Sequence, residues 1–311
     1  MFKTITENFI EDPVLEMDIT EPTDEIKLFG KTYRMYKDEW KHHVHIKCTN
    51  YCDANCRFCI ERDSKCEKGD PDKLLASVVD LLEQMDEQGH LYTVSLTGGE
   101  PTAYPYINCL LDIIEGFFLK TFSINTNGRY LDAIAPGRLD GWIDVSKHKI
   151  HDKDVFQRDW EVTPEFIKRQ RERHPKMKVR FQCVLGLENG LKSVDEIREY
   201  MDAFSDVVDD FSFRSLIIED CEGSVPKLFG DFRKWLFDNG WCVQQTIQDY
   251  YVYEDFKPAG MKPITISWSN MAMLKKYNET HNNNFLEEII VHPDGMITGS
   301  WNKKTLVIKG A

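Results

Sequence analysis

Cys52-Asp-Ala-Asn-Cys56-Arg-Phe-Cys59 is the most informative stretch of this 311-residue chain. Its CxxxCxxC spacing places three thiols on one short loop, where they can bind a single metal centre. A cubane iron–sulfur cluster normally takes four cysteine ligands, and the neighbouring sequence offers no clear fourth. One iron of such a cluster would be left for an outside ligand, which is typical of a catalytic metal site.

Zinc is the main alternative ligand for these cysteines. A tetrahedral structural zinc site needs paired ligands, such as two CxxC motifs or one CxxC with a His pair. The sequence has no second CxxC, but His42, His43 and His45 lie just upstream and keep a mixed zinc site open. Disulfides are disfavoured, because no signal peptide is recognisable and the crowded cysteines suit a reducing compartment.

A second motif, Gly98-Gly99-Glu100-Pro101, follows the strand-like run Tyr92–Thr97 and predicts a tight turn at the end of that strand. Alone it is a weak signal. Together, the two motifs resemble the radical S-adenosylmethionine (SAM) superfamily over about Val44 to Leu216. The resemblance is to its simpler, single-cluster members, near the molybdenum-cofactor A enzyme and viperin.

The resemblance implies a site. In the family the three cysteines, here Cys52, Cys56 and Cys59, bind a 4Fe–4S cluster whose fourth iron is chelated by the amino and carboxylate groups of SAM. Gly98, Gly99 and Glu100 match the turn that contacts the methionine amino group, and the backbone of Phe58 matches a position near the adenine. Relatives with auxiliary clusters carry several more cysteines in the tail. The tail of this chain has no such set of cysteines, which predicts a single cluster.

Strands and helices alternate after His43, which predicts βα units and a parallel sheet. The family resemblance makes this an α/β fold with a partial (β/α)6, TIM-barrel-like core at residues 43–217. An N-terminal extension at 1–42, with a strand-like run at Lys27–Tyr36, and a β-rich C-terminal region with a helix at 218–311 complete the predicted domains. The C-terminal region is expected to have a hairpin turn at His292-Pro-Asp-Gly295 and strands at Tyr250–Tyr253, Pro263–Trp268, Leu286–Val291 and Met296–Trp301. The predicted strands are His43–Cys48, Tyr92–Thr97, Lys120–Asn125, Asp140–Ser146, Met177–Leu185 and Asp209–Leu216. The predicted helices are Pro71–Gln88, Tyr106–Phe117, Thr163–Arg173 and Ser193–Phe204.

Five of these strands alternate polar and apolar residues, although parallel strands covered on both sides read as apolar runs. The pattern predicts helices on the apolar face and a polar chamber on the other, at whose carboxyl ends α/β folds place their sites. A half-exposed sheet is the alternative. By the same parity Cys183 faces the helices, and Asn127-Gly128 reads as a turn.

The candidate SAM-binding residues on the polar face are Asn125 and Ser146, which suit ribose hydroxyls. Arg214 suits the SAM carboxylate or, equally, an ion pair with Asp144. Lys147, His148 and Arg214 are the candidates for binding or protonating the substrate.

The composition limits the partners. The net charge of −13 argues against a nucleic-acid substrate, because proteins that bind a phosphate backbone usually present a basic face. No apolar run is long enough to span a membrane. The expected protein is cytoplasmic and oxygen-sensitive, and takes electrons from a flavodoxin- or ferredoxin-type reductant.

Three functions follow for testing. The first is a radical SAM enzyme that takes a hydrogen atom from a small-molecule or nucleotide-like substrate. The second keeps this chemistry but acts on a peptide, as a maturase or epimerase. The third is a non-catalytic iron–sulfur protein for electron transfer or sensing, which needs four cysteines per cluster and has no use for the Gly-Gly-Glu-Pro turn.

Overall fold

The computed structural model of this chain describes residues 9–11, 23–36, 43–59, 69–91, 93–216, 224–240, 242–248, 251–257, 259–269, 285–286, 288–301 and 306–311. It divides into two compact units. The cysteine unit comprises Asp18–Asp144, Arg169–Met177 and Asn282–Ala311, and the tail unit comprises Met1–Met17, Val145–Lys168 and Lys178–His281. The division falls within strand β7 and helix α5.

Six strands alternate with helices along the chain, as predicted. They are β4 (His43–Thr49), β5 (Thr93–Gly98), β6 (Thr121–Thr126), β7 (Trp142–Ser146), β8 (Lys178–Leu185) and β9 (Asp210–Ser215). Each matches a predicted strand to within two residues. Strand β5 pairs in parallel with both β4 and β6, and β8 pairs in parallel with β9. The predicted α/β class with parallel strands is therefore confirmed.

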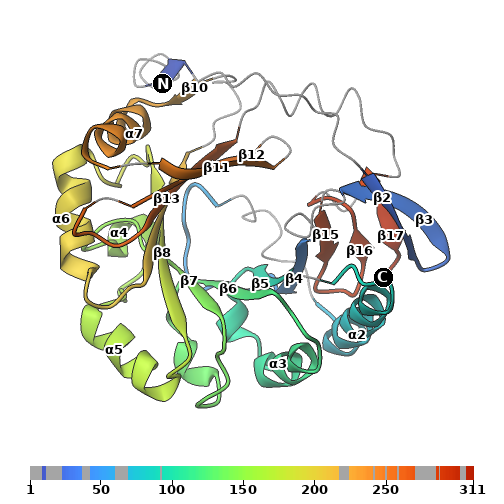
Figure 1. Ribbon diagram of the computed structural model, residues 1–311. Coiled ribbons are helices and arrows are strands. Elements are labelled where there is room, and N and C mark those ends of the chain that lie inside the picture. Colours follow the sequence, from blue (N-terminus) through green and yellow to red (C-terminus); the bar gives the residue numbers. More distant parts are fainter. Residues whose placement is uncertain are drawn as a thin grey trace. The chain divides into compact units, whose positions relative to one another are not determined.

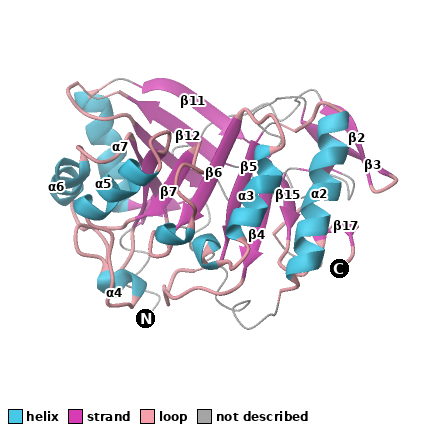
Figure 2. Ribbon diagram, turned by 90° about the horizontal axis from the view of Figure 1, so that it is seen from below, coloured by secondary structure: helices cyan, strands magenta, loops and turns pink. Residues whose placement is uncertain are grey.

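In the cysteine unit the strand order is β6-β5-β4-β15-β16-β17. Helices α2 (Pro71–Glu87) and α3 (Ile107–Glu115) lie along one side of β4 and β5 (Figures 1 and 2). The side chain of Asp70 caps α2 by accepting a hydrogen bond from the Lys73 amide, and the apolar positions of α2 recur at helical spacing. The fully buried apolar positions of α2 are Leu74, Val78, Leu81, Leu82 and Met85.

The side-chain parity of β5 follows the prediction, and β4, which was not among the five strands of that prediction, shows the same alternation. Val44, Ile46, Val94 and Leu96 alternate with the polar residues of these strands and are at most 1% exposed. Because successive side chains of a strand point to opposite faces, the polar residues share the other face. One of them, Ser95, accepts a hydrogen bond from the neighbouring strand β6.

The N-terminal part of the cysteine unit differs from the prediction. The run Lys27–Tyr36, predicted as one strand, is a hairpin of β2 (Thr23–Leu28) and β3 (Lys31–Tyr36). Phe29 and Gly30 form its turn with φ values of 48° and 78°, which a two-residue hairpin turn requires. The single-strand prediction was wrong because it passed over this Gly.

The C-terminal strands of the cysteine unit are β14 (Phe285–Leu286), β15 (Glu288–Val291), β16 (Ile297–Thr298) and β17 (Val307–Lys309). Strand β15 pairs in parallel with β4 and antiparallel with β16. The turn between β15 and β16 closes with hydrogen bonds from the His292 amide to the Met296 carbonyl and from the Gly295 amide to the His292 carbonyl. The predicted hairpin at His292-Pro-Asp-Gly295 is therefore confirmed.

In the tail unit the strand order is β11-β12-β13-β9-β8, and β1 pairs with β10. The elements are β1 (Phe9–Glu11), α4 (Lys153–Phe156), α6 (Val194–Phe204), β10 (Ser224–Pro226), α7 (Lys227–Asn239), β11 (Cys242–Gln248), β12 (Tyr251–Phe256) and β13 (Ile264–Ser269). Strand β11 was not predicted, because its polar run resembles a loop. Helices α6 and α7 lie side by side (Figure 1).

Helix α5 (Pro164–Arg173) and the short 3-10 helices η2 (Pro101–Ala103) and η3 (Leu131–Ala133) complete the elements. None of the helices in the described residues combines the length and apolar character needed to cross a bilayer.

Candidate functional site

The cysteine loop, residues 50–59, follows β4 directly. Cys52, Cys56 and Cys59 are all half-buried and none is in a disulfide, and the Cys59 amide donates to the Cys56 carbonyl at 3.3 Å. The loop has no helix or strand of its own. Its shape therefore depends on the segments that contact it.

The first of these segments is the glycine turn, residues 98–102, at the end of β5. The Gly99 amide donates to the Thr49 carbonyl and the Glu100 amide to the Tyr51 carbonyl, both at 2.6 Å. A Cβ atom on Gly99 would lie 2.1 Å from the Tyr51 carbonyl oxygen, and one on Gly98 would lie 2.6 Å from the Thr49 carbonyl oxygen. Both glycines are needed so that the turn can approach the start of the cysteine loop.

The Glu100 carboxylate lies inside this turn and is 1% exposed. One oxygen, Oε1, accepts from the Thr102 amide at 3.0 Å and from the Thr102 and Thr126 hydroxyls at 2.5 Å each, and Oε2 accepts from the Asn127 amide at 2.7 Å. Burial raises the pKa of Glu100, whereas these four donors act to lower it. The carboxylate thus joins the ends of β5 and β6 and fixes the glycine turn against the asparagine-bearing end of β6.

The second supporting segment is the asparagine turn, residues 126–130, at the end of β6. The Asn127 side-chain amide donates to Asp53 Oδ1 at 2.8 Å and to Cys52 Sγ at 3.8 Å. Arg129 Nη1 donates to Asp53 Oδ2 at 3.1 Å. A hydrogen bond with Tyr51, together with burial, raises the pKa of Tyr130 to about 12. Three residues of this turn therefore contact the cysteine loop.

The donor set of the loop fits an iron–sulfur cluster. Among the described residues, no three His, Cys, Asp or Glu side chains converge to the distances of metal ligands. The fit is therefore judged from the chemistry of the thiols and from the hydrogen bonds that support their loop. Three thiols on one loop, none in a disulfide, are the ligands that iron–sulfur clusters take. An amide donor directed at Cys52 Sγ is the kind of outer contact that orients and tunes such ligands.

Comparison with known families shows to which family the chain belongs. A profile of the Radical SAM superfamily matches residues 46–201, just over half of the chain. The chain belongs to the radical SAM superfamily. The predicted family and enzyme class are thereby confirmed, and the matched segment includes the cysteine loop and both supporting turns.

Two curated relatives have names that refer to nucleotides. The "S-adenosylmethionine-dependent nucleotide dehydratase" of Thermoplasmatales archaeon (strain ISO4-H5) is 27% identical over 238 residues, which is 70% of this chain and 79% of the relative. The "Probable GTP 3',8-cyclase" of Sulfolobus acidocaldarius is 30% identical over 112 residues, or 36% of this chain and 34% of the relative.

A solved structure supports the fold. The structure of Streptococcus suis SuiB bound to S-adenosylmethionine resembles this chain with a TM-score of 0.55 and 17% identity. The likeness covers 83% of this chain and 60% of the SuiB chain. The prediction of a partial radical SAM barrel is confirmed at the level of fold.

The remaining predicted SAM-binding residues are placed as follows. Phe58 is half-buried in the cysteine loop, and Asn125 is half-buried in β6 with its amide donating to Ser95 Oγ at 2.8 Å. In the tail unit Ser146, the last residue of β7, is half-buried and Arg214 is exposed. The cysteine unit alone therefore holds the cysteines, Phe58, the glycine turn and Asn125.

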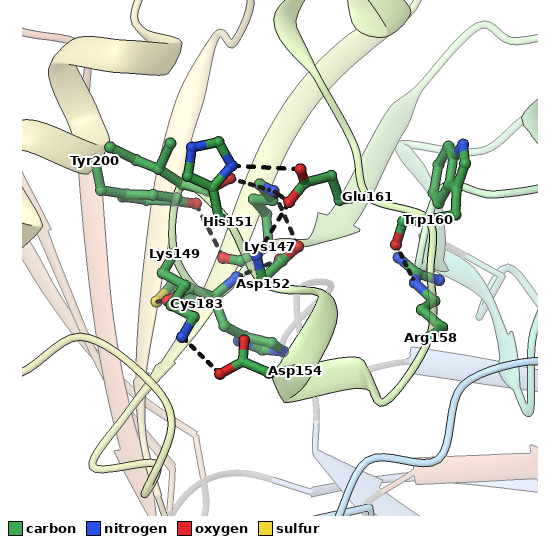
Figure 3. Close-up of polar contacts among 12 residues, drawn as sticks. Lys147, Lys149, His151, Asp152, Asp154, Arg158, Trp160, Glu161, Cys183 and Tyr200 are labelled. Carbon is green, nitrogen blue, oxygen red and sulfur yellow. Dashed lines mark hydrogen bonds and ion pairs between the residues drawn. The ribbon is translucent and has the colours of Figure 1, made fainter.

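The predicted Lys147 and His148 belong to a buried polar network after β7. Lys147 Nζ lies 3.0 Å from Asp152 Oδ1 and donates to the Ile150 carbonyl, and both charged side chains are fully buried. Glu161 extends the network: its Oε2 lies 3.9 Å from Lys147 Nζ, and its Oε1 lies 3.3 Å from Nδ1 of the exposed His151. Figure 3 shows these four side chains turned toward one another. We call Lys147, His151, Asp152 and Glu161 the ion-pair cluster.

The electrostatics of the ion-pair cluster follow from its burial. Burial lowers the pKa of Lys147 and raises that of Asp152, whereas their attraction opposes both shifts. His148 is 3% exposed, and its Nδ1 accepts from the Val184 amide at 3.1 Å. Burial, together with the charges of Lys147 and Arg158, lowers the pKa of His148 to about 3. These contacts favour a structural part for Lys147 and His148.

Sequence reasoning missed the role of Asn127. Asn127-Gly128 was interpreted as a turn, and Gly128 does have a φ of 89°. The available signal was position: a polar residue directly after a parallel strand lies where α/β folds place their sites. That the neighbouring segment was the cysteine loop emerges only from the fold.

Proposed function

We propose that this chain reductively cleaves SAM at one 4Fe–4S cluster held by Cys52, Cys56 and Cys59, and acts on a nucleotide-like substrate. The observation that carries the proposal is the joint support of one three-thiol loop by the glycine turn and the asparagine turn. A structural zinc site or a disulfide loop does not require a glycine turn at that point.

When bound, the cluster and SAM supply an electron-driven S–C5′ cleavage whose 5′-deoxyadenosyl radical takes a hydrogen atom from the substrate. The residues of the chain hold the cluster and position SAM. The half-buried thiols are the iron ligands, and iron binding favours their thiolate form. The Glu100 carboxylate fixes the glycine turn, whose backbone is assigned to the SAM amino group, and the backbone of Phe58 is assigned to the adenine.

Asn125 and Ser146 are assigned to the SAM ribose and Arg214 to the SAM carboxylate. These are polar side chains at or near the carboxyl ends of β6, β7 and β9, which is where α/β folds place ligands. The open assignment is the residue that donates or accepts protons on the substrate, for which Lys147, His148 and Arg214 were the candidates. Of these, Arg214 alone is exposed.

The substrate class rests on the two relatives, whose names are a nucleotide dehydratase and a GTP cyclase. A nucleotide is also compatible with the net charge of −13, because a small anion needs only a few local donors. A flavodoxin- or ferredoxin-type reductant and a cytoplasmic location complete the proposal.

The test is anaerobic. The purified protein is loaded with iron and sulfide, SAM and dithionite are added, and 5′-deoxyadenosine is quantified. Nucleoside triphosphates deuterated on the ribose are then supplied one at a time, and deuterium in the 5′-deoxyadenosine identifies the substrate. Transfer from a peptide instead would replace the nucleotide part of the proposal.

The matched variants are Cys56→Ala and Cys109→Ala. Cys109 is an exposed free thiol on α3, away from the loop, so its removal should leave iron content and product unchanged. Cys56→Ala should lose both. Retention of the cluster and of product in Cys56→Ala would refute the assignment of the iron ligands. A loaded wild-type protein that releases no 5′-deoxyadenosine with any nucleotide or peptide would favour the electron-transfer or sensing alternative.

A further inference from the structure

Asn127 contacts the cysteine loop in a way that the assembly of the loop alone does not require. Its side-chain amide has two N–H groups; it donates to Asp53 Oδ1 at 2.8 Å and to Cys52 Sγ at 3.8 Å. The Asp53 contact tethers the loop. The contact with Cys52 Sγ is directed at an atom that is assigned to iron.

The orientation of Asn127 is fixed from two further sides. Its backbone amide donates to Glu100 Oε2 at 2.7 Å, and its Oδ1 accepts from the Arg129 amide at 3.0 Å. The residue is 6% exposed, so its hydrogen bonds are shielded from water and correspondingly stronger. The amide is therefore held in one orientation and is not free to rotate away from the cysteine loop.

We infer that Asn127 is a positioning residue that sets the reduction potential of the cluster through its N–H contact with Cys52. This inference rests on the proposed function, because it requires a cluster on Cys52. Hydrogen bonds to the sulfur ligands are among the determinants of iron–sulfur potentials. A donor withdraws negative charge from the thiolate and thereby favours the reduced cluster, which carries one more electron.

Asp53 acts in the opposite direction. Its carboxylate is next to Cys52 in sequence, is 6% exposed as a side chain, and pairs with Arg129 Nη1 at 3.1 Å. A negative charge there disfavours the addition of an electron to the cluster, and Arg129 offsets part of this effect. Asn127 and Asp53 therefore make opposite contributions to the potential, although they are hydrogen-bonded to each other.

The opposite signs provide the test. Asn127→Leu has nearly the same shape but neither donor nor charge, and Asp53→Asn keeps an acceptor for Asn127 but removes the charge. Each loaded protein, without SAM, is titrated with a reductant and the reduced cluster is followed by EPR, alongside its iron content. We expect Asn127→Leu to lower the equilibrium constant for reduction about tenfold, or about 59 mV for one electron. Asp53→Asn should shift the midpoint upward.

The matched control is Asn108→Leu. Asn108 also joins two backbone groups, donating to the Ala133 carbonyl and accepting from the Ala135 amide, but it has no contact with the loop in the described hydrogen bonds. Its variant should leave the midpoint unchanged. A purely structural Asn127 would lower iron retention without moving the midpoint, and an unchanged midpoint in a fully loaded Asn127→Leu would overturn the inference.

Two further outcomes, a protein that binds no cluster and a variant that does not fold, are distinguished from those above. A wild-type protein that binds no cluster overturns the proposed function itself, before any midpoint is measured. If Asn127→Leu does not fold, wild-type protein labelled with ¹⁵N-asparagine is examined by pulsed EPR of the reduced cluster. The absence of any ¹⁵N coupling would overturn the inference without the variant.

Discussion

Both the cysteine loop and the ion-pair cluster are polar networks that follow a strand, but they are built from different groups. The cysteine loop is held by backbone amides, the Asn127 side-chain amide and the Arg129 guanidinium, and its thiols remain half-buried. In the ion-pair cluster Lys147 and Asp152 are fully buried and bind each other. The first network directs donors at groups that are proposed to bind a ligand. The second satisfies its own charges and fixes a loop.

The largest effect is expected when the ion-pair cluster loses one partner. Asp152→Ala removes the carboxylate that pairs with Lys147, while the Lys147 ammonium stays fully buried. Removing one member of a buried ion pair costs about 3–5 kcal/mol, because the other charge stays desolvated. We expect the free energy of unfolding, measured in urea, to fall by that amount.

The chain contains its own control for this variant. Lys149 Nζ and Asp154 Oδ2 are 2.9 Å apart at the same sequence spacing, but their side chains are 25% and 54% exposed. Exposed ion pairs contribute about 0.2–1 kcal/mol, so Asp154→Ala should be nearly neutral. Equal losses in the two variants would show that burial is not what distinguishes them.

The next largest effect is expected in the cysteine unit. Gly99→Ala places a Cβ atom against the Tyr51 carbonyl oxygen, where only 2.1 Å is available, so the glycine turn must separate from the cysteine loop. Misplacement of a positioning group by about 1 Å can cost about 100-fold in rate. The rate of 5′-deoxyadenosine formation in loaded protein should fall by that order.

Gly116→Ala is the matched control. Gly116 ends helix α3 with an ordinary φ of −70°, and a Cβ there would lie 3.1 Å from the Ile113 carbonyl oxygen, which a small shift relieves. It should keep the wild-type rate. If Gly99→Ala also keeps that rate, the close approach of the glycine turn does not matter for the reaction.

A pH dependence is expected from the residue next to the ion-pair cluster. His148 has a pKa lowered to about 3 from its ordinary 6.5, so between these values the unfolded chain binds a proton that the folded chain does not. The contribution of His148 to the free energy of unfolding is fully present above pH 6.5 and is lost as the pH falls toward 3. Between about pH 7.5 and about pH 5.5 the loss is about 1.4 kcal/mol.

His148→Asn should abolish this loss, because an amide oxygen can still accept from the Val184 amide but does not titrate. Urea unfolding of both proteins at the two pH values measures it. His151→Asn, at a histidine whose side chain is 85% exposed, is the control and should keep the wild-type difference. An identical pH difference in His148→Asn would mean that His148 is not buried in its neutral form.

The sequence predicted the six strands from β4 to β9 and most of the helices between them, because each leaves a local pattern of alternation or helical spacing. The iron ligands stay a prediction from the CxxxCxxC spacing. The sequence did not predict the contacts between segments. Asn127 meets Cys52 across 75 positions and Glu100 meets Thr126 across 26. Lys147 and His148 were candidates for chemistry on the basis of residue type and loop position. Their partners, Asp152 and the Val184 amide, depend on burial that no local pattern encodes.

The smallest effect is expected at the ion pair of Asp53 in the cysteine loop with the more exposed Arg129. Arg129 pairs with Asp53, but its side chain is 40% exposed, and Asp53 also accepts from Asn127. Arg129→Ala should therefore change the free energy of unfolding of the protein by about 0.2–1 kcal/mol. The difference should shrink in about 1 M salt, where the Debye length is about 3 Å. A loss as large as that of Asp152→Ala would mean that charge, and not the Asn127 amide, holds the cysteine loop, and the two networks would then be alike.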